Sequence, residues 1–405
     1  MLGDRQEKKQ GGWYKLPRNV IMLGLVSFFT DVSSEMIYPL IPLFLVQALG
    51  ATPVVLGLIE GIAEATASLL KVFSGIVSDR FATRKPLILA GYGISSFLRP
   101  LIGFARTWPF VLFIRFSDRV GKGIRTSPRD ALIAESTTPD RYGTAYSLHR
   151  AMDHAGAVVG PLIAFFLLWK WDVGLRSIFF LAALPGILAV VTLALGVREP
   201  RGRGRRENPI TLKEASGLGG GFYRYLAVIF LFTLGNASDA FILLKISEST
   251  GGLYSVPLLW GAFHLVKSAA SLPAGSIADK MGKREVAAAG WIVYGATYVG
   301  LAHAASTWSF LFFLSTYALY YGLTEGVEKA LVAELVPDDR LGVGFGLFHF
   351  ALGAGALPAS ILFGYLWKSF GPQAAFYLSA GLALLATILL LTVDFNGKKG
   401  GNNRE

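Results

Sequence analysis

Long apolar stretches without a single charged residue set the strongest constraint on how this chain folds. Ser177 to Val197 is one such stretch, and Gln373 to Val393 is another. The apolar layer of a bilayer is about 30 Å thick, so a helix needs roughly 20 residues to cross it. In lipid the backbone polar groups must be satisfied inside the segment itself. These stretches are therefore predicted to be transmembrane helices.

The composition agrees with a membrane protein and argues against other classes. Of the 405 residues, 53% are hydrophobic and 16% are charged, whereas a soluble domain has about a quarter of its residues charged. The 29 Phe, 15 Tyr and 8 Trp exclude an intrinsically disordered chain. Cysteine is absent, which excludes a disulfide framework and a thiolate metal site.

Clusters of Gly, Pro and charged residues divide the chain into twelve predicted helical spans. Val286 to Thr324 is long enough for two of them, folded back between His303 and Trp308. We expect an all-α membrane protein with spans that begin near residues 18, 53, 86, 108, 140, 174, 222, 254, 285, 308, 341 and 371.

The distribution of cations predicts the orientation of the chain, because Lys and Arg stay in cytoplasmic loops during insertion. Cations cluster in 5–18, 80–85, 198–224, 280–284 and 398–404, all on one side, while the other side holds only Arg106, Lys170, Arg176 and Lys368. We expect both termini in the cytoplasm and the protein in the cell (inner) membrane. The first span is too long for a signal-peptide core and is predicted to be retained. The net charge of +11 then needs no nucleic-acid partner.

The two halves of the chain repeat each other. Gly75-Ile-Val-Ser-Asp79-Arg80 recurs as Gly275-Ser-Ile-Ala-Asp279-Lys280, and Ala131-Leu-Ile-Ala-Glu135 recurs as Ala330-Leu-Val-Ala-Glu334. We therefore predict two pseudo-symmetric six-helix bundles, 18–197 and 222–394, joined by a cytoplasmic linker at 198–221 and flanked by tails at 1–17 and 395–405. Such halves are typical of transporters that rock about a solute site near the midplane.

The segment after the second span resembles the Gly-x-Leu-Ala-Asp-Arg-x-Gly-Arg-Arg motif of the major facilitator superfamily of secondary transporters. The matching residues are Gly75, Asp79, Arg80, Arg84 and Lys85, while Ala82 stands at the usual Gly. Arg115 falls on the fourth-helix arginine of that family. The resemblance implies a non-enzymatic transporter of a small solute that needs no cofactor.

A second, weaker resemblance concerns the fifth span. Gly156-x-x-x-Gly160-Pro161 is similar to the core of a motif common in antiporters of that family, although Ala164-Phe165 stand where it closes with Gly-Gly. This departure leaves the direction of transport open.

The repeated Gly-x-x-x-Asp-basic segments are predicted to gate the pathway. An aspartate at the end of one helix can accept backbone N–H groups at the start of a helix in the other half, where the helix dipole favours an anion. The alternative is a solvated loop of the positive-inside kind, but topology requires cations there and not a repeated aspartate. The gating residues are Gly75, Asp79, Arg80, Gly275, Asp279 and Lys280.

Charged residues inside spans cost about 3 kcal/mol each in lipid, so we expect them to face the interior. At about 100° per residue, the charges of the fourth span fall within an arc of about 140°, and the tenth span gathers tyrosines and glutamates on one side. The predicted substrate pathway comprises Arg115, Asp118, Arg119, Lys122, Arg150, Asp153, Tyr321 and Glu325.

Two acids occupy matching places in the first and seventh spans, Glu35 and Asp239. A carboxylate at that depth can exchange protons as the cavity opens alternately, so both are predicted to couple transport to protons, together with Glu60 and Glu64. The alternative is a permanent pairing with Arg115, Arg119 or Lys245, which would keep the acids ionised.

The excess of Arg and Lys on the fourth span favours an anionic or zwitterionic solute, and a proton-driven exporter of drugs or amphiphiles is the alternative. An intramembrane enzyme or a receptor would belong to another class, but no His-Glu-x-x-His or Gly-x-Ser-x-Gly motif is present. His149 and Asp153 have a metal-ligand spacing without a second pair, so no metal is predicted. We expect a monomer whose partners are the solute, protons and membrane lipid.

Overall fold

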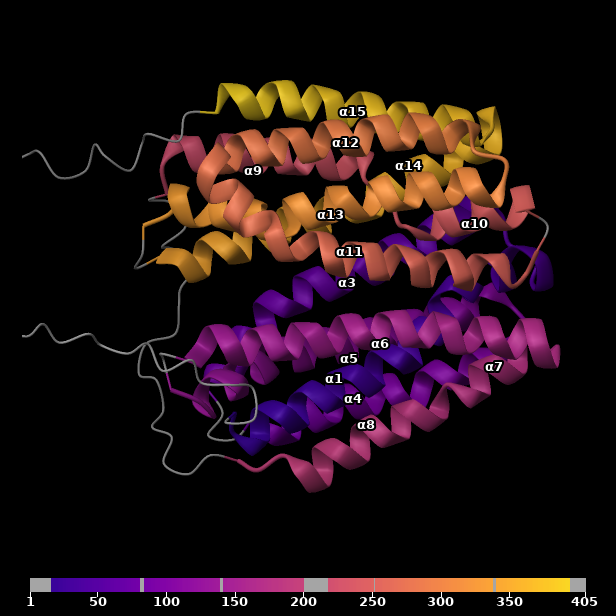
Figure 1. Ribbon diagram of the computed structural model, residues 1–405, viewed down its shortest axis with the longest axis horizontal. Helices are drawn as coiled ribbons and strands as arrows, with labels where there is room; N and C mark the ends of the chain where they lie inside the picture. The colour runs from indigo at the N-terminus through magenta and orange to yellow at the C-terminus, as the bar shows by residue number, and fades with distance from the viewer. Residues whose placement is uncertain are drawn as a thin grey trace, which may run out of the picture.

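The computed structural model describes residues 16–80, 84–138, 141–199, 218–250, 252–337 and 340–393. These residues form helices and no strands, and the helices pack side by side in two bundles (Figure 1). The indigo-to-magenta bundle holds the first half of the chain, and the orange-to-yellow bundle holds the second.

The first bundle contains six long helical segments. Its elements are α1 (Arg18–Ile37) continued by η2 (Tyr38–Leu40), α2 (Ile41–Leu43) and η3 (Phe44–Ala48), then α3 (Pro53–Arg80), α4 (Lys85–Leu98) with η4 (Arg99–Phe104), α5 (Trp108–Glu135), α6 (Tyr142–Trp171), and α7 (Leu175–Leu181) with α8 (Ala183–Gly196).

The second bundle repeats this arrangement. Its elements are α9 (Gly220–Gly235) with α10 (Ala240–Thr250), α11 (Ser255–Met281), α12 (Lys283–His303), α13 (Thr307–Leu335), α14 (Leu341–Phe370) and α15 (Pro372–Thr392). The all-α prediction is confirmed, and the segments begin within a few residues of the expected positions. Among the described residues, eight segments are long and apolar enough to cross a membrane by composition alone; α5, α11, α12 and α13 are not among them.

The first and seventh spans are interrupted at equivalent places, which the sequence analysis did not anticipate. The first changes to a 3₁₀ turn at Tyr38–Leu40, where Pro39 and Pro42 lack the N–H that an α-helix needs. The seventh span is interrupted between Gly235 and Ala240. The Tyr294 hydroxyl donates to the freed carbonyl of Gly235 at 2.7 Å. Broken helices at membrane depth are tolerated where neighbouring groups satisfy the backbone.

We call the end of the molecule where α1 begins and α15 ends the terminal face, on the left in Figure 1, and the other end the opposite face. The two bundles are closed against each other toward the opposite face. A Cβ on Gly57 of α3 would collide with the carbonyl oxygen of Ser360 of α14, and one on Gly61 would lie 2.9 Å from the Cα of Leu357. Gln47 also donates to Ser247 across the two bundles at 2.9 Å.

Toward the terminal face an open cavity of about 460 Å³ lies between the bundles. Its lining comes from α6 of the first bundle and from α11, α12 and α13 of the second, and includes Arg150, His154, Asp279, Glu325 and Lys329. The molecule is therefore closed at the opposite face and hollow toward the terminal face.

Candidate transport site

The charged stripe of α5 is tied to α3 by two ion pairs. Arg115 donates to both carboxylate oxygens of Glu60, at 2.9 and 2.6 Å, and both side chains are almost fully buried. One turn further, Arg119 lies 2.8 Å from Glu64, whose side chain is 45% exposed. Bidentate guanidinium–carboxylate pairs fix geometry strongly, so these residues hold α3 and α5 together.

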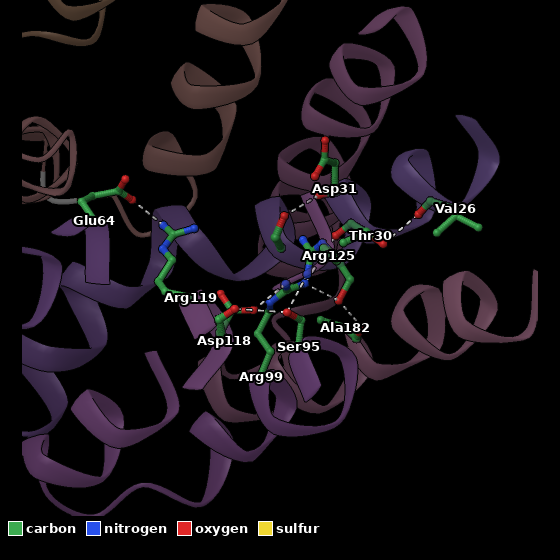
Figure 2. Close-up of polar contacts among 12 residues, drawn as sticks. Val26, Thr30, Asp31, Glu64, Ser95, Arg99, Asp118, Arg119, Arg125 and Ala182 are labelled. Atoms are coloured by element: carbon green, nitrogen blue, oxygen red, sulfur yellow. Dashed lines mark hydrogen bonds and ion pairs between the residues drawn. The ribbon is translucent and has the colours of Figure 1, made fainter. Parts of the chain in front are cut away.

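Asp118, on the same stripe of α5, faces a different neighbour. Its carboxylate lies 2.8 Å from Arg99 at the end of α4, and both side chains are about 6% exposed. Arg99 also donates to the Ser33 hydroxyl of α1 at 3.2 Å. Figure 2 shows Arg99, Asp118 and Ser95 grouped inside the first bundle. The pathway prediction for Asp118 thus falls on a residue that joins α4, α5 and α1.

Two charged groups near the middle of the first bundle have no such contact. Within the described part of the chain, the Asp31 carboxylate of α1 and the Lys122 ammonium of α5 make no hydrogen bond or ion pair, although each is half-buried. The nearby Asp153 of α6 accepts a hydrogen bond from Ser27 and lies 3.5 Å from His149.

Glu35 makes a polar contact between the two bundles. The indole Nε1 of Trp260 in α11 donates to its Oε2 at 2.9 Å, and Nε2 of His264 lies 3.6 Å from the same oxygen. The Tyr38 ring packs on the Trp260 ring with centroids 5.7 Å apart. Sequence reasoning found Glu35 but missed its partners, because an apolar helix with one Trp and one His gives no sign of which side meets another bundle.

Asp239 is held within the second bundle. Its two carboxylate oxygens accept from the Tyr317 hydroxyl at 2.6 Å and the Tyr321 hydroxyl at 3.3 Å. Among the described contacts, neither Asp239 nor Glu35 is paired with Arg115, Arg119 or Lys245, the alternative that the sequence left open.

The remaining pathway residues meet beside the cavity. Lys267 of α11 lies 4.0 Å from the centre of the Tyr321 ring and 3.6 Å from the Glu325 carboxylate. Arg150 of α6 approaches the same carboxylate from the other bundle, also at 3.6 Å. Glu325 is therefore shared between cations of the two halves, and sequence reasoning did not find Lys267 as a member of this cluster.

The predicted gating residues are only partly described. Helix α3 includes Gly75, Asp79 and Arg80, but their surroundings lie outside the described part of the structure, as do those of Gly275 in α11. Asp279 and Lys280 are exposed near the end of α11, and Asp279 lines the cavity with Lys283. For metals, the described residues contain no group of three or more His, Asp or Glu side chains placed to hold an ion.

Comparison with known proteins agrees with this architecture. The family model for the Major Facilitator Superfamily matches residues 23–244 and 225–405. An uncharacterised MFS-type transporter of Methanocaldococcus jannaschii is 32% identical over 94% of this chain and 96% of its own. The multidrug resistance protein MdtH of Proteus mirabilis is 32% identical over 40% of this chain and 38% of its own.

Among solved structures, a POT family transporter in complex with 5-aminolevulinic acid superposes with a TM-score of 0.79. It is 14% identical in sequence, and the match covers 96% of this chain and 98% of the other. At that identity the likeness shows the fold, two six-helix bundles around a central gap. Together with the family match, it shows that this chain is a multi-pass membrane transporter of the major facilitator superfamily.

Proposed function

We propose that this transporter moves a small anionic or zwitterionic solute across the cell membrane by alternating access, and that Glu35 couples the movement to protons. The observation that carries the proposal is the hydrogen bond from Trp260 to Glu35, because it joins the two bundles near the middle of the first predicted span. A proton-exchanging group can drive a conformational change only if its charge matters differently in the two states.

The ionised form of Glu35 favours the state that is closed at the opposite face. A hydrogen bond to a carboxylate is about twice as strong as one between neutral groups, so protonation weakens the contact with Trp260. The charged and titratable groups facing Glu35 are His264 on α11, Lys122 on α5 and Asp31 on its own helix. Asp239 instead bonds tyrosines of its own bundle, so its ionisation does not act directly on the contact between the bundles.

Distance measurements between spin labels test this coupling without knowledge of the solute. The chain has no cysteine, so label pairs need no background substitutions. Tyr142→Cys with Met281→Cys reports the terminal face, and Trp171→Cys with Tyr254→Cys reports the opposite face; all four side chains are exposed. In liposomes, lowering the pH should lengthen the opposite-face distance and shorten the terminal-face distance.

Glu35→Gln should change the ratio of the two states, closed and open at the opposite face, about tenfold in favour of the open state at neutral pH. A tenfold change corresponds to the loss of about 1.4 kcal/mol of a charge-assisted hydrogen bond. It should also abolish their pH dependence. Asp239→Asn is the matched control and should leave the pH dependence in place. If both variants respond to pH like the unmodified protein, Glu35 is not the coupling group.

We further propose that the terminal face is cytoplasmic, which places both termini, the 198–221 linker and the gating residues on that side, and that the protein acts as a monomer. The clustering of Lys and Arg supports this orientation. Glu60 and Glu64, each paired with an arginine, then serve to hold α3 against α5. Accessibility of single introduced cysteines to a membrane-impermeant reagent in intact cells distinguishes the two orientations.

Export of drugs is a second candidate function, favoured by one observation. The second bundle is rich in aromatic rings beside Glu35 and Asp239, with Phe263 stacked between Trp260 and Tyr317 at centroid distances of 4.6 and 5.6 Å. The partial likeness to a multidrug resistance protein agrees with it. Efflux of ethidium from cells that express the protein, lost on treatment with a protonophore, would support this candidate over the first.

A further inference from the structure

We propose that Asp31 and Lys122 together form a binding site for a zwitterion, in which Asp31 receives an ammonium group and Lys122 receives a carboxylate. The site rests on the proposed transport function and specifies its substrate class. Amino acids and short peptides are the small solutes that carry both groups.

Lys122 is the exception among the charged side chains of α5. Its neighbours are all engaged: Arg115 with Glu60, Asp118 with Arg99, Arg119 with Glu64, Arg125 with Ser95 and the Tyr92 ring, and Arg129 with Asp130. Arg115, Arg119 and Arg129 are thus paired with carboxylates of the protein, and Arg125 is held by a hydroxyl and an aromatic ring. In the described part of the chain, Lys122 is the one charged side chain of α5 without a hydrogen bond, ion pair or ring contact, so the positive stripe does not by itself specify a polyanion.

Asp31 is the corresponding exception on α1. Of the two acids one turn apart on that helix, Glu35 accepts a hydrogen bond from Trp260, whereas the Asp31 carboxylate is without a partner among the described residues. An unpaired charge near the middle of a membrane protein costs several kcal/mol. Asp31 interacts electrostatically with Lys122 and Arg125 as well as with Asp153, but neither Asp31 nor Lys122 forms an ion pair among the described residues, so each lacks a direct counter-ion.

Asp31 lies on the face of α1 that meets the other bundle. Asp31 and Glu35 are four residues apart and share a face of α1, and Glu35 reaches α11 of the other bundle. Lys122 is three residues from Arg119, on the same side of α5. In Figure 2 the Asp31 carboxylate points away from the Arg99–Asp118 pair, and Arg119 reaches toward Glu64 and also away from that pair.

Aromatic side chains form the far side of the gap. Trp260 and Phe263 stack there and are almost fully buried, and the Tyr321 ring packs edge-on against Phe263 at 5.9 Å. Among the other half-buried lysines without a partner in the described structure, Lys71 and Lys329 lie nearer the terminal face, where Lys329 borders the open cavity, and Lys245 lies on α10 of the other bundle. Water can solvate Lys329, which leaves Lys122 as the unpaired lysine near the middle of the first bundle.

Matched sets of probes test the requirement for both charges. The first set is phenylalanine, phenethylamine and 3-phenylpropanoate, which share a skeleton and differ only in charged groups. The second is leucine, 3-methylbutylamine and 4-methylpentanoate. A solute that binds the folded protein raises its unfolding temperature by mass action. We expect at least one zwitterion to stabilise the purified full-length protein at a concentration at least tenfold lower than either of its singly charged analogues.

Charge-removing variants should change the selectivity and not merely weaken binding. Asp31→Asn should accept the acid at least as well as the zwitterion, and Lys122→Gln should accept the amine. Because a gain of binding is measured, a partly destabilised variant still gives an answer. The matched controls are Asp172→Asn and Lys170→Gln, which change charges at the end of α6 on the opposite face, away from Asp31 and Lys122. Both should keep the selectivity for zwitterions.

Several outcomes overturn the proposal. The site is wrong if no zwitterion stabilises the protein, if the singly charged analogues do so equally, or if neither variant changes its preference. It is also wrong if a double-mutant cycle without solute shows that Asp31 and Lys122 stabilise each other directly, as a structural ion pair would. Loss of the pH response in the spin-label experiment with selectivity intact would remove the proton coupling alone.

Discussion

The interiors of the two bundles are built from different chemistry although their helices repeat. The first bundle is crossed by guanidinium–carboxylate pairs such as Arg115–Glu60 and Arg99–Asp118. The second is filled by tyrosine rings, with Tyr294 stacked on Tyr298 at 4.1 Å, and its buried acid Asp239 is held by hydroxyl groups. A duplicated fold therefore constrains helix placement but leaves each half free to satisfy its buried polar groups differently.

The difference has consequences for stability. Removing one member of a buried ion pair leaves an uncompensated charge and costs about 3–5 kcal/mol, whereas removing one hydroxyl costs about 1 kcal/mol. The first bundle is accordingly the less tolerant of substitution. Tyr294 and Tyr298 are almost fully buried, so in the second bundle the rings hold the helices together by packing, and the loss of one hydroxyl leaves that packing in place.

The largest expected effect is on the Arg115–Glu60 pair. Glu60→Gln leaves the buried Arg115 without a counter-charge, so we expect a loss of about 3–5 kcal/mol of stability. Thermal unfolding of the purified protein in detergent measures it. The matched change in the second bundle is Tyr294→Phe, which removes one buried hydroxyl. Similar losses for both variants would contradict the contrast between the bundles.

A second prediction concerns Arg99 and Asp118. Arg99→Met alone should destabilise by about 3 kcal/mol, because Asp118 remains buried and charged. Arg99→Met combined with Asp118→Leu should recover most of that loss, since an apolar pair of similar size replaces a buried ion pair at little cost. Thermal unfolding of both single variants and the double variant gives the coupling energy. A double variant no better than Arg99→Met would show that the pair is not the reason for the loss.

The smallest effect is expected at Tyr317, whose hydroxyl donates to Asp239 at 2.6 Å. Tyr317→Phe should cost about 1.5 kcal/mol, the lower end of the range for one hydrogen bond to a charged group, because Tyr321 still donates to the other carboxylate oxygen. Tyr365→Phe, on an exposed part of α14, should leave the unfolding temperature unchanged. A loss at Tyr317 as large as that of Glu60→Gln would make the two bundles energetically alike.

The sequence predicted the fold well because the physics of the bilayer acts on single segments. A charge-free run such as Ser177 to Val197 has few other options, and the repeat between Asp79 and Asp279 relates the halves without knowledge of their packing. The interruptions of the first and seventh spans were missed. Pro39 and Pro42 could have indicated the first, and Gly235-Asn236 the second.

The site was predicted less completely, because helical periodicity gives the direction of a side chain but not its partner. Arg115 and Asp118 fall in the same arc of α5, yet one meets α3 and the other meets α4. Arg99 was overlooked although an arginine inside a span already implies a buried acid. The partners of Glu35 lie more than 200 positions away in the chain, and no local pattern connects them.

The glycine seam between α3 and α14 has a consequence for leakage. Where Gly57 and Gly61 meet Ser360 and Leu357, the two backbones touch and no side chain separates them. A protein that let a continuous file of water run between its halves would conduct ions and dissipate any gradient across the membrane. Direct backbone contact leaves no room for such a file, so the glycine seam closes the path for water between the two bundles toward the opposite face.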